Sequence, residues 1–381
     1  MTLGERLADK RVCICAGSGG VGKTTISAAI ALGLARRGAK VAVVTIDPAR
    51  RLATSLGLAE LDNEPRLVSP ELSARQGVPI EGELWAMMLD AKRTFDDLIV
   101  RLAPDSQTAE EVLANRIYKE LSSAIAGSQE FTAIAKLYEL DRERAFDVIV
   151  LDTPPSRNAL DFLDAPTRLL QFFEGRALKV FLAPTGLAAR LAARGSGMVF
   201  ALLSRLTGVD LVADLSVFFR ALGGLIDGFR ERAAGVDALL RDPATTFLVV
   251  SSPEREPAEE AIFFAAKLRE AGMRCGGLVV NRVHRDGLGG HEPGEVAEAL
   301  EQQLGGRLAR RVAANLADFD VLVRRDERAI ARLSDELGEP EPIVVPHLDR
   351  DVYDLAGLAG VEEHLFATAA RTASGAATRH P

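Results

Sequence analysis

A glycine-rich segment near the start of the sequence has the composition of a phosphate-binding loop. It fits the pattern G-x-x-x-x-G-K-[ST] and comprises Gly17, Ser18, Gly19, Gly20, Val21, Gly22, Lys23 and Thr24, with Thr25 directly after it. Glycines allow the backbone to wrap around a phosphate and to present its amide N–H groups to the anion. Lys23 can reach the β- and γ-phosphates of a nucleotide, and the Thr24 hydroxyl can bind Mg²⁺. The alternative is a purely structural turn, but the segment follows a strand-like run and opens a helix-like one, which favours the phosphate site.

Two aspartates follow apolar runs that are typical of buried strands. Asp47 comes after residues 41–46, and Asp152 comes after residues 146–151. A carboxylate at a strand end beside a phosphate loop can hold Mg²⁺, directly or through water. A second carboxylate can orient or deprotonate an attacking water. Each aspartate could instead be a helix cap or a turn residue.

The segments around these residues alternate between strand-like and helix-like patterns. Short apolar runs predict strands at 11–16, 41–46, 84–89, 146–151, 246–251, 276–281 and 343–345. A helix is expected from Lys23 to Arg37, ending near Gly38. The alternation predicts an α/β fold, with a mostly parallel, doubly wound sheet and helices on both faces. In such sheets, ligands bind beyond the carboxyl ends of the strands.

Two long stretches, 91–144 and 158–241, interrupt this alternation. Neither contains a convincing strand, and the second is unusually apolar, so we expect both to be helical. We predict that they form one inserted helical subdomain within a single domain that spans 1–372. Residues 285–293 are expected to form a Gly-rich surface loop, and residues 373–381 a flexible tail.

Composition and charge exclude several classes of protein. The 381 residues include 46 Lys and Arg against 54 Asp and Glu, a net charge of −8, which argues against general nucleic-acid binding. The sequence contains no apolar run of about 18 residues, so no transmembrane segment is expected. Its first residues lack the apolar core of a signal peptide, which predicts a cytoplasmic location. Three cysteines cannot build a disulfide framework, and we expect Cys13 and Cys15 to be core residues.

Three segments taken together, GSGGVGKTT, TIDPA and DTPP, resemble the deviant-Walker-A ATPases. That group includes arsenical-pump ATPases, tail-anchored-protein-targeting ATPases and partition ATPases. Three further features are similar to the arsenical-pump and tail-anchor branch, namely the apolar stretch after Asp152, Asn281 at a strand end, and the sequence VPHL at 345–348. The resemblance spans residues 10 to about 366. It looks closest to the ArsA-like ATPases of high-GC bacteria.

The resemblance implies a P-loop NTPase fold and an ATPase that uses ATP and Mg²⁺. It implies that residues 19–25 cradle the triphosphate, with Thr24 on the metal. Asp47 would activate water in a first switch, and Asp152 would begin a second switch that leads to the helical subdomain. Asn281 would read the adenine edge, and the backbone near Pro346 would line the base pocket.

The sequence departs from the family pattern at several positions. Ser18 stands where the family usually has a lysine that reaches across a dimer interface to the partner's phosphates. Arg50 and Arg157 also replace residues that are usual in the two switches. No CxxC zinc pair and no arsenite-binding cysteines are evident. The missing cation predicts either a heterodimer with a related ATPase subunit that retains the lysine, or a homodimer that uses a local arginine.

The expected function is an ATPase whose nucleotide state moves the helical subdomain, which handles a protein or hydrophobic partner such as a membrane-protein client. The main alternative is a nucleotide-binding regulatory or scaffold subunit with little turnover, working in a heterodimer. A partition-type positioning ATPase would need a basic DNA- or membrane-binding surface. A metalloid-pump motor would need a cysteine site, so both rank lower.

Overall fold

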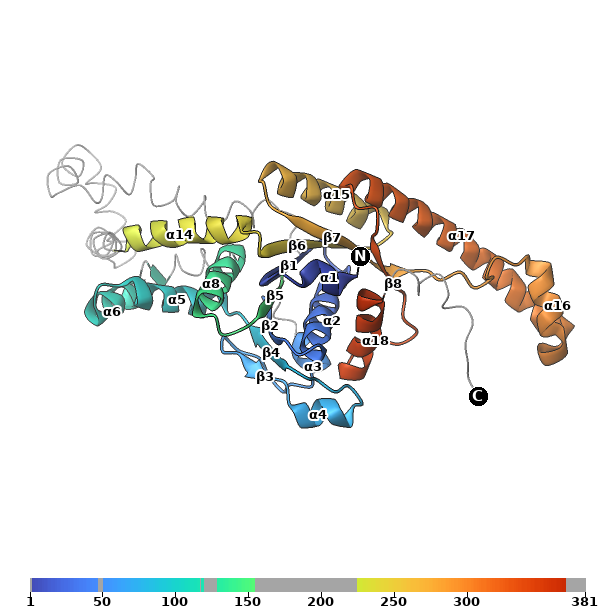
Figure 1. Ribbon diagram of the computed structural model, residues 1–381, viewed down its shortest axis with the longest axis horizontal. Coiled ribbons are helices and arrows are strands. Elements are labelled where there is room, and N and C mark those ends of the chain that lie inside the picture. Colours follow the sequence, from blue (N-terminus) through green and yellow to red (C-terminus); the bar gives the residue numbers. More distant parts are fainter. Residues whose placement is uncertain (1, 47–50, 117, 120–128, 155–224, 368–381) are drawn as a thin grey trace, which may run out of the picture. The chain divides into compact units, whose positions relative to one another are not determined.

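The computed structural model describes residues 2–46, 51–116, 118–119, 129–154 and 225–367 (Figure 1). The chain divides into two compact units. The first unit comprises Met1–Met88, Glu143–Leu160 and Arg241–Pro381, and the second comprises Leu89–Arg142 and Asp161–Leu240.

The first unit is built on an eight-stranded sheet with the order β3-β4-β2-β5-β1-β6-β7-β8. The strands are β1 Val12–Ala16, β2 Lys40–Thr45, β3 Arg66–Leu67, β4 Glu83–Met88, β5 Val148–Asp152, β6 Thr245–Ser251, β7 Cys275–Val283 and β8 Ile343–Pro346. Every neighbouring pair is parallel except β3 with β4. The predicted mostly parallel sheet is confirmed.

The inner strands are buried along their whole length because both faces of the sheet are covered. All residues of β1, β5 and β6 are buried, as expected for a parallel sheet between two layers of helices. The seven predicted strands are present with small shifts of their bounds, and β5 extends to include Asp152. The sequence analysis missed β3, because an exposed strand of two residues leaves no periodic pattern.

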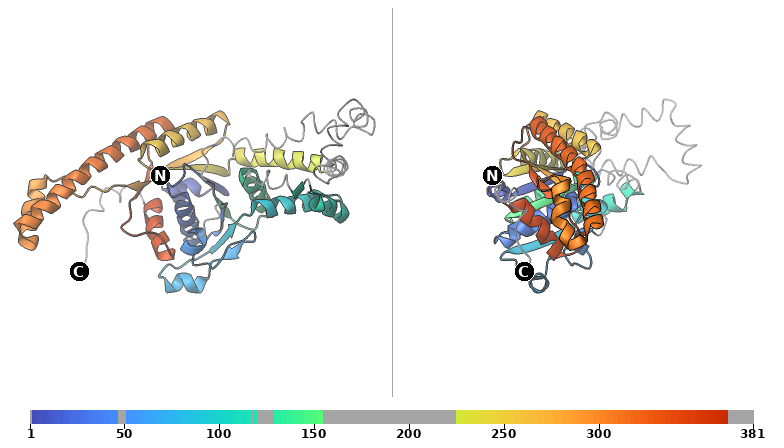
Figure 2. Two further views of the ribbon diagram at one scale, coloured as in Figure 1. Left: turned by 180° about the vertical axis from the view of Figure 1, so that it is seen from behind. Right: turned by 90° about the vertical axis from the view of Figure 1, so that its right-hand side faces the viewer.

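Helices cover both faces of this sheet (Figures 1 and 2). The helices of the first unit are α1 Leu3–Leu7, α2 Lys23–Arg36, α3 Arg51–Ser55, α4 Pro70–Arg75, α15 Arg255–Glu270, α16 Pro293–Leu304, α17 Gly306–Leu337 and α18 Leu355–Phe366. Successive residues of β6 face opposite sides of the sheet and therefore contact different layers of helices. Phe247 packs against Phe264 of α15, whereas Leu248 belongs to the core that includes α2 and α18.

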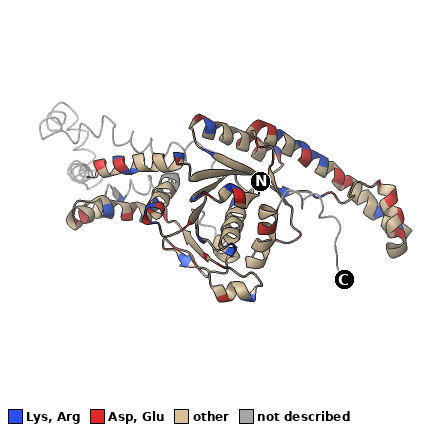
Figure 3. Cartoon of the chain, in the orientation of Figure 1, with Lys and Arg blue, Asp and Glu red and all other residues tan. Residues whose placement is uncertain are grey.

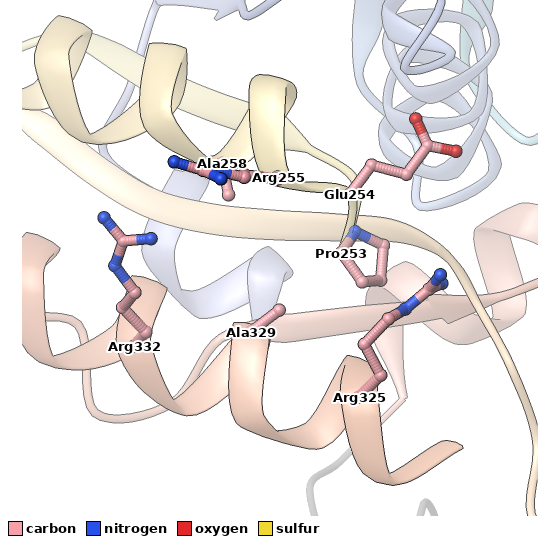
Figure 4. Close-up of a pocket in the computed structure, with 7 residues that line it drawn as sticks. All are labelled: Pro253, Glu254, Arg255, Ala258, Arg325, Ala329 and Arg332. Atoms are coloured by element: carbon pink, nitrogen blue, oxygen red, sulfur yellow. The ribbon is translucent and has the colours of Figure 1, made fainter. Parts of the chain in front are cut away.

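The long helix α17 is joined to the sheet at its C-terminal half. It packs against α15 and β7, and its N-terminal part packs against α16. Figure 4 shows Ala258 of α15 and Ala329 of α17 facing each other across a small cavity, with Arg325 and Arg332 on either side of Ala329. Basic and acidic residues alternate along α17 (Figure 3).

The predicted loop at 285–293 ends one residue early, because Pro293 begins α16.

The second unit is helical in the part that the structure describes. Its helices are α5 Ala91–Leu102, α6 Ser106–Ala114, α8 Gln129–Glu143 and α14 Ile226–Arg241. Phe95 stacks on both Tyr118 and Phe229. Most of the second predicted helical stretch, together with the tail at 373–381, lies outside the described residues, and the extent of the single domain stays a prediction. Among the helices described, none combines the length and the apolar character needed to cross a bilayer.

Candidate active site

The glycine-rich segment connects the end of β1 to the start of α2, which is the arrangement that a phosphate loop requires. A Cβ atom at Gly17 would lie 2.0 Å from the Val250 carbonyl oxygen, so only glycine allows this approach of the loop to β6. Gly22 has a φ of 91° and is the N-cap of α2. No side chain caps this helix, which leaves its first amide N–H groups and the positive end of its dipole for an anion.

Lys23 folds back over this loop. Its side chain is buried, and Nζ donates a hydrogen bond of 2.8 Å to the Ser18 carbonyl oxygen. The Ser18 residue is also buried, and its hydroxyl donates to the Gly19 carbonyl oxygen at 3.4 Å. The Ser18 hydroxyl therefore stays within the loop, while the ammonium group of Lys23 lies against the loop backbone.

Asp152 lies at the end of β5, between β1 and β2 in the sheet. Its Oδ2 atom accepts hydrogen bonds from the Thr24 hydroxyl at 2.7 Å and from the Thr45 hydroxyl at 2.9 Å. The residue is only 1% exposed. Directly after it, the Thr153 hydroxyl donates to the Cys15 carbonyl oxygen at 2.9 Å. These contacts fix the carboxylate beside the first turn of α2.

The oxygens of Thr24 and Asp152 fit a magnesium ion. Mg²⁺ prefers oxygen ligands and is usually bound by one or two protein oxygens together with substrate phosphates and water. The described part of the chain has no group of three His, Cys, Asp or Glu residues placed to hold a metal. With two protein oxygens at its start, this loop suits a metal site that is completed by phosphate oxygens.

Asn281 contacts the phosphate loop from the end of β7. Its Nδ2 atom donates to the Val21 carbonyl oxygen at 2.8 Å, and its Oδ1 atom accepts from the Arg282 backbone N–H at 2.9 Å. The register of β7 against β8 shifts between Val280 and Val283, and Arg282 has a φ of 62°. This irregularity turns Asn281 toward the loop. One amide hydrogen and one oxygen lone pair remain for a base.

A cavity of about 640 Å³ lies beside the start of α2 and Asn281, within the size range of small-molecule sites. It is lined by Gly22, Thr24, Thr25, Arg51, Thr54, Ser55, Asn281, Arg282, Pro346, His347, Leu348, Arg350, Asp351, Val352, Tyr353 and Val361. The structure thus brings the helix end of the phosphate loop, Asn281 and Pro346 to one cavity, although 260 residues separate Asn281 from Val21.

Asp47, Arg50 and Arg157 are outside the described residues. Cys13 and Cys15 are completely buried in β1. Their mutual hydrogen bond and their burial raise the pKa of the Cys13 thiol well above its usual range. The prediction that they are core residues is confirmed.

Sequence reasoning missed several residues near the cavity. Arg51 and Arg350 line it and add positive charge. His347 also lines it, and its ring lies parallel to that of His284. Arg51 and Arg350 belong to no local motif, and His347 was noted only as part of the sequence VPHL, without a role of its own. The sequence signalled His284 only through its nearness to Asn281.

Comparison with known proteins identifies the family. The model of the family described as anion-transporting ATPase matches residues 10–288. The chain belongs to the anion-transporting ATPase family. The family model ends before α16 and α17 begin.

Several curated proteins resemble this anion-transporting ATPase family member. It is 29% identical over 276 residues to the putative arsenical pump-driving ATPase 1 of Aquifex aeolicus, covering 72% of this chain and 63% of that protein. It is 30% identical over 274 residues to the uncharacterized protein SCO2128 of Streptomyces coelicolor, covering 72% and 62%. The ATPase GET3 of Malassezia globosa is 25% identical over 272 residues, covering 71% of both chains. The match therefore spans less than two thirds of the first two relatives. The expected family is confirmed, and the branch in high-GC bacteria stays a prediction.

Proposed function

We propose that this protein is an ATPase that binds ATP with Mg²⁺ in the cavity at the phosphate loop. The observation that carries the proposal is the contact between Thr24 and Asp152 at the uncapped start of α2. It supports the proposal because two oxygens of the kind that Mg²⁺ prefers lie beside the first amide groups of α2 and a buried lysine. Membership of the family and the names of two of the relatives, from Aquifex aeolicus and Malassezia globosa, which are named as ATPases, support the same function.

Each residue has a defined task in the proposed reaction. Lys23 would exchange its hydrogen bond with the Ser18 carbonyl oxygen for bonds to phosphate oxygens, because a charged acceptor binds an ammonium group more strongly than a carbonyl does. Thr24 and Asp152 would hold Mg²⁺, which when bound neutralises the negative charge of the phosphates. Asp47, which the sequence places after β2, would orient or deprotonate the attacking water. Asn281 and the backbone at Pro346 would contact the base.

Asp152 also connects the proposed nucleotide site to the segment of the chain that follows it. Thr153 is tied to β1 through Cys15, and the chain continues from there into the segment that the resemblance treats as the second switch. We propose that the nucleotide state shifts this segment and the helical subdomain, which would handle a hydrophobic or membrane-protein client.

We also propose that the working unit is a dimer. The Ser18 side chain carries no charge and its hydroxyl bonds within its own loop, so position 18 cannot supply a cation to a partner. A heterodimer with a related subunit that retains the lysine would restore this charge in trans. The same observation favours a second candidate, a nucleotide-binding regulatory subunit with little turnover of its own.

The test is calorimetry of ATP binding with Mg²⁺, followed by turnover of the isolated chain. Lys23→Ala should weaken ATP binding, whereas the control Lys92→Ala should not, because Lys92 pairs with Asp96 on the exposed side of α5. Asp47→Asn should slow hydrolysis by about 10²–10⁴-fold while ATP still binds. Equal ATP affinity of the wild type and Lys23→Ala would refute the assigned site.

A further inference from the structure

A buried carboxylate on α17 lies close to the cavity without lining it. Asp326 is completely buried. Its Oδ2 atom accepts hydrogen bonds from the His284 backbone N–H at 3.0 Å and from His284 Nδ1 at 2.7 Å. Its Oδ1 atom accepts from Arg325 Nε at 3.2 Å and from Arg325 Nη2 at 2.9 Å. Burial alone would raise the pKa of Asp326, but the bonds from His284 and Arg325 outweigh it and hold this pKa below its ordinary value.

The carboxylate fixes the ring of His284. An ionised carboxylate only accepts hydrogen bonds, so Nδ1 of His284 is the donor in this contact. The ring lies nearly parallel to the ring of His347, with centroids 6.3 Å apart and planes at 19°. Phe319 of α17 meets it edge-on, with centroids 6.0 Å apart. The orientation of His284 is thus set by Asp326 and by two neighbouring rings.

His347 links the ring of His284 to the cavity. It lines the cavity together with Asn281 and Pro346. Its backbone N–H donates to the Val283 carbonyl oxygen at 2.9 Å, directly before His284. The side chain and backbone of His347 are therefore both held by the segment that contains His284. Asp326 and His347 lie beyond the residues that the family model matches.

We propose that Asp326 is a positioning residue for the part of the cavity that receives the nucleotide base, acting through His284 on the ring of His347. The ligand class is a nucleoside triphosphate, so the proposal rests on the proposed function. Its physical basis is that a ring at a binding site contributes most when its orientation is fixed before the ligand arrives, because less conformational entropy is then lost on binding. Asp326 supplies this orientation from a helix that does not itself line the cavity.

The first test needs no nucleotide. Asp326→Asn keeps the shape of the side chain but removes its charge. The oxygen that accepts from Nδ1 of His284 also accepts from the His284 backbone N–H, so an amide group turned toward the ring would oppose that N–H, and an amide oxygen in its place accepts more weakly than a carboxylate. We expect side-chain ¹⁵N NMR at about pH 8, where an ordinary histidine is neutral, to show a changed ratio of the two tautomers of His284 and shifted resonances of His347. The matched control is Arg324→Gln, which removes an exposed ion pair with Asp320 on the same helix. Unchanged His347 resonances in Asp326→Asn would overturn the proposal.

The second test separates the base from the phosphates. Calorimetry compares ATP with inorganic tripolyphosphate, both with Mg²⁺. Asp326→Asn should weaken ATP binding by about 3- to 10-fold, the effect typical of one lost hydrogen bond, and leave tripolyphosphate binding unchanged. His347→Ala should weaken ATP binding in the same selective way. The double variant should bind ATP no more weakly than His347→Ala alone, because Asp326 acts on the nucleotide only through the ring of His347.

A third variant protects the test against misfolding. If Asp326→Asn does not fold, His284→Gln replaces a partly exposed ring with a side chain that can still donate to Asp326, and it should show the same selective loss of ATP affinity. Equal losses for ATP and tripolyphosphate, or ATP binding unchanged in all variants, would overturn this proposal alone. A wild type that binds tripolyphosphate but not ATP would overturn the proposed function as well.

Discussion

The hydroxyl of Thr24 donates a hydrogen bond of 2.7 Å to the carboxylate of Asp152, across 128 residues of sequence. The two residues meet because β1 and β5 are parallel neighbours, with Cys15 opposite Asp152. The carboxyl ends of both strands therefore lie at one edge of the sheet, where the phosphate loop also begins. A pair of oxygens suited to a hard cation thus meets at this edge of the sheet.

We expect Thr24→Ala to remove most of the dependence of ATP binding on Mg²⁺. The loss of a ligand oxygen should lower the affinity for ATP measured with Mg²⁺ by about tenfold or more, while the affinity measured with EDTA changes little. Thr24→Ser, which keeps the hydroxyl, serves as the control and should restore the metal effect. The metal assignment is wrong if Thr24→Ala and the wild type respond equally to Mg²⁺ in calorimetry.

Asn281 should give the cavity a preference for adenine. Its remaining amide hydrogen and oxygen lone pair can contact one donor and one acceptor, which matches the N6 amino group and a ring nitrogen of adenine, whereas guanine presents O6 at that edge. Asn281→Ala should therefore lower the ratio of ATP to GTP affinity, as measured by competition with a fluorescent nucleotide. A wild type with equal affinity for ATP and GTP would contradict the prediction.

Glu362 of α18 ties that helix to the end of α2. It is 3% exposed, and its two oxygens lie 2.7 Å from Arg36 Nη1 and 2.5 Å from Arg37 Nη1. Glu362→Gln removes a negative charge that both arginines share, so urea denaturation should show a loss of about 1–3 kcal/mol in the free energy of unfolding. This is less than for a fully buried pair, because both arginines are partly exposed.

The matched control for this change is Glu363→Gln, one residue further along the same helix and exposed. A surface substitution of this kind usually changes the free energy of unfolding by less than about 0.5 kcal/mol. Equal effects of the two substitutions would show that the contacts of Glu362 with Arg36 and Arg37 do not stabilise the fold.

His364 should make the protein less stable in mild acid. Burial lowers its pKa from 6.5, the positive charge of Arg285 lowers it further, and Glu363 opposes both. Nη2 of Arg285 lies 3.1 Å from Nε2 of His364, which can accept this hydrogen bond only while it is unprotonated. As the pH falls below 6.5 toward the lower pKa of the folded state, the unfolded chain binds a proton that the folded chain does not. The free energy of unfolding therefore decreases over this window, by at most about 1.4 kcal/mol per pH unit.

Urea denaturation at several pH values, from neutral down to about one unit below the usual histidine pKa, tests this prediction. His364→Gln cannot bind the proton, so its stability should vary less with pH over the same range than that of the wild type. Parallel pH profiles for the two proteins would show that His364 does not contribute to acid sensitivity.

The sequence by itself determined the phosphate loop, its place between a strand and a helix, the mostly parallel sheet and the family. These features depend on local rules. Glycine permits the conformation of Gly22 and the close approach at Gly17, and apolar runs of strand length separated by helical segments predict parallel strands. Asp152 could be recognised for the same reason, since a carboxylate that ends a buried strand stands out within a few residues. The role of Asp47 also comes from the sequence and stays a prediction.

The tertiary structure alone decided which distant residues meet. Strand order places Asp152 beside Thr24, and the register shift at the end of β7 turns Asn281 toward Val21. Asp326 and His284 come from α17 and the segment after β7, where no periodicity or motif marks them. The reason is physical: local patterns fix the backbone conformation and the buried face of each element, but the contacts between elements depend on how the whole chain packs. A buried charge such as Asp326 is stable only where that packing supplies its hydrogen-bond donors.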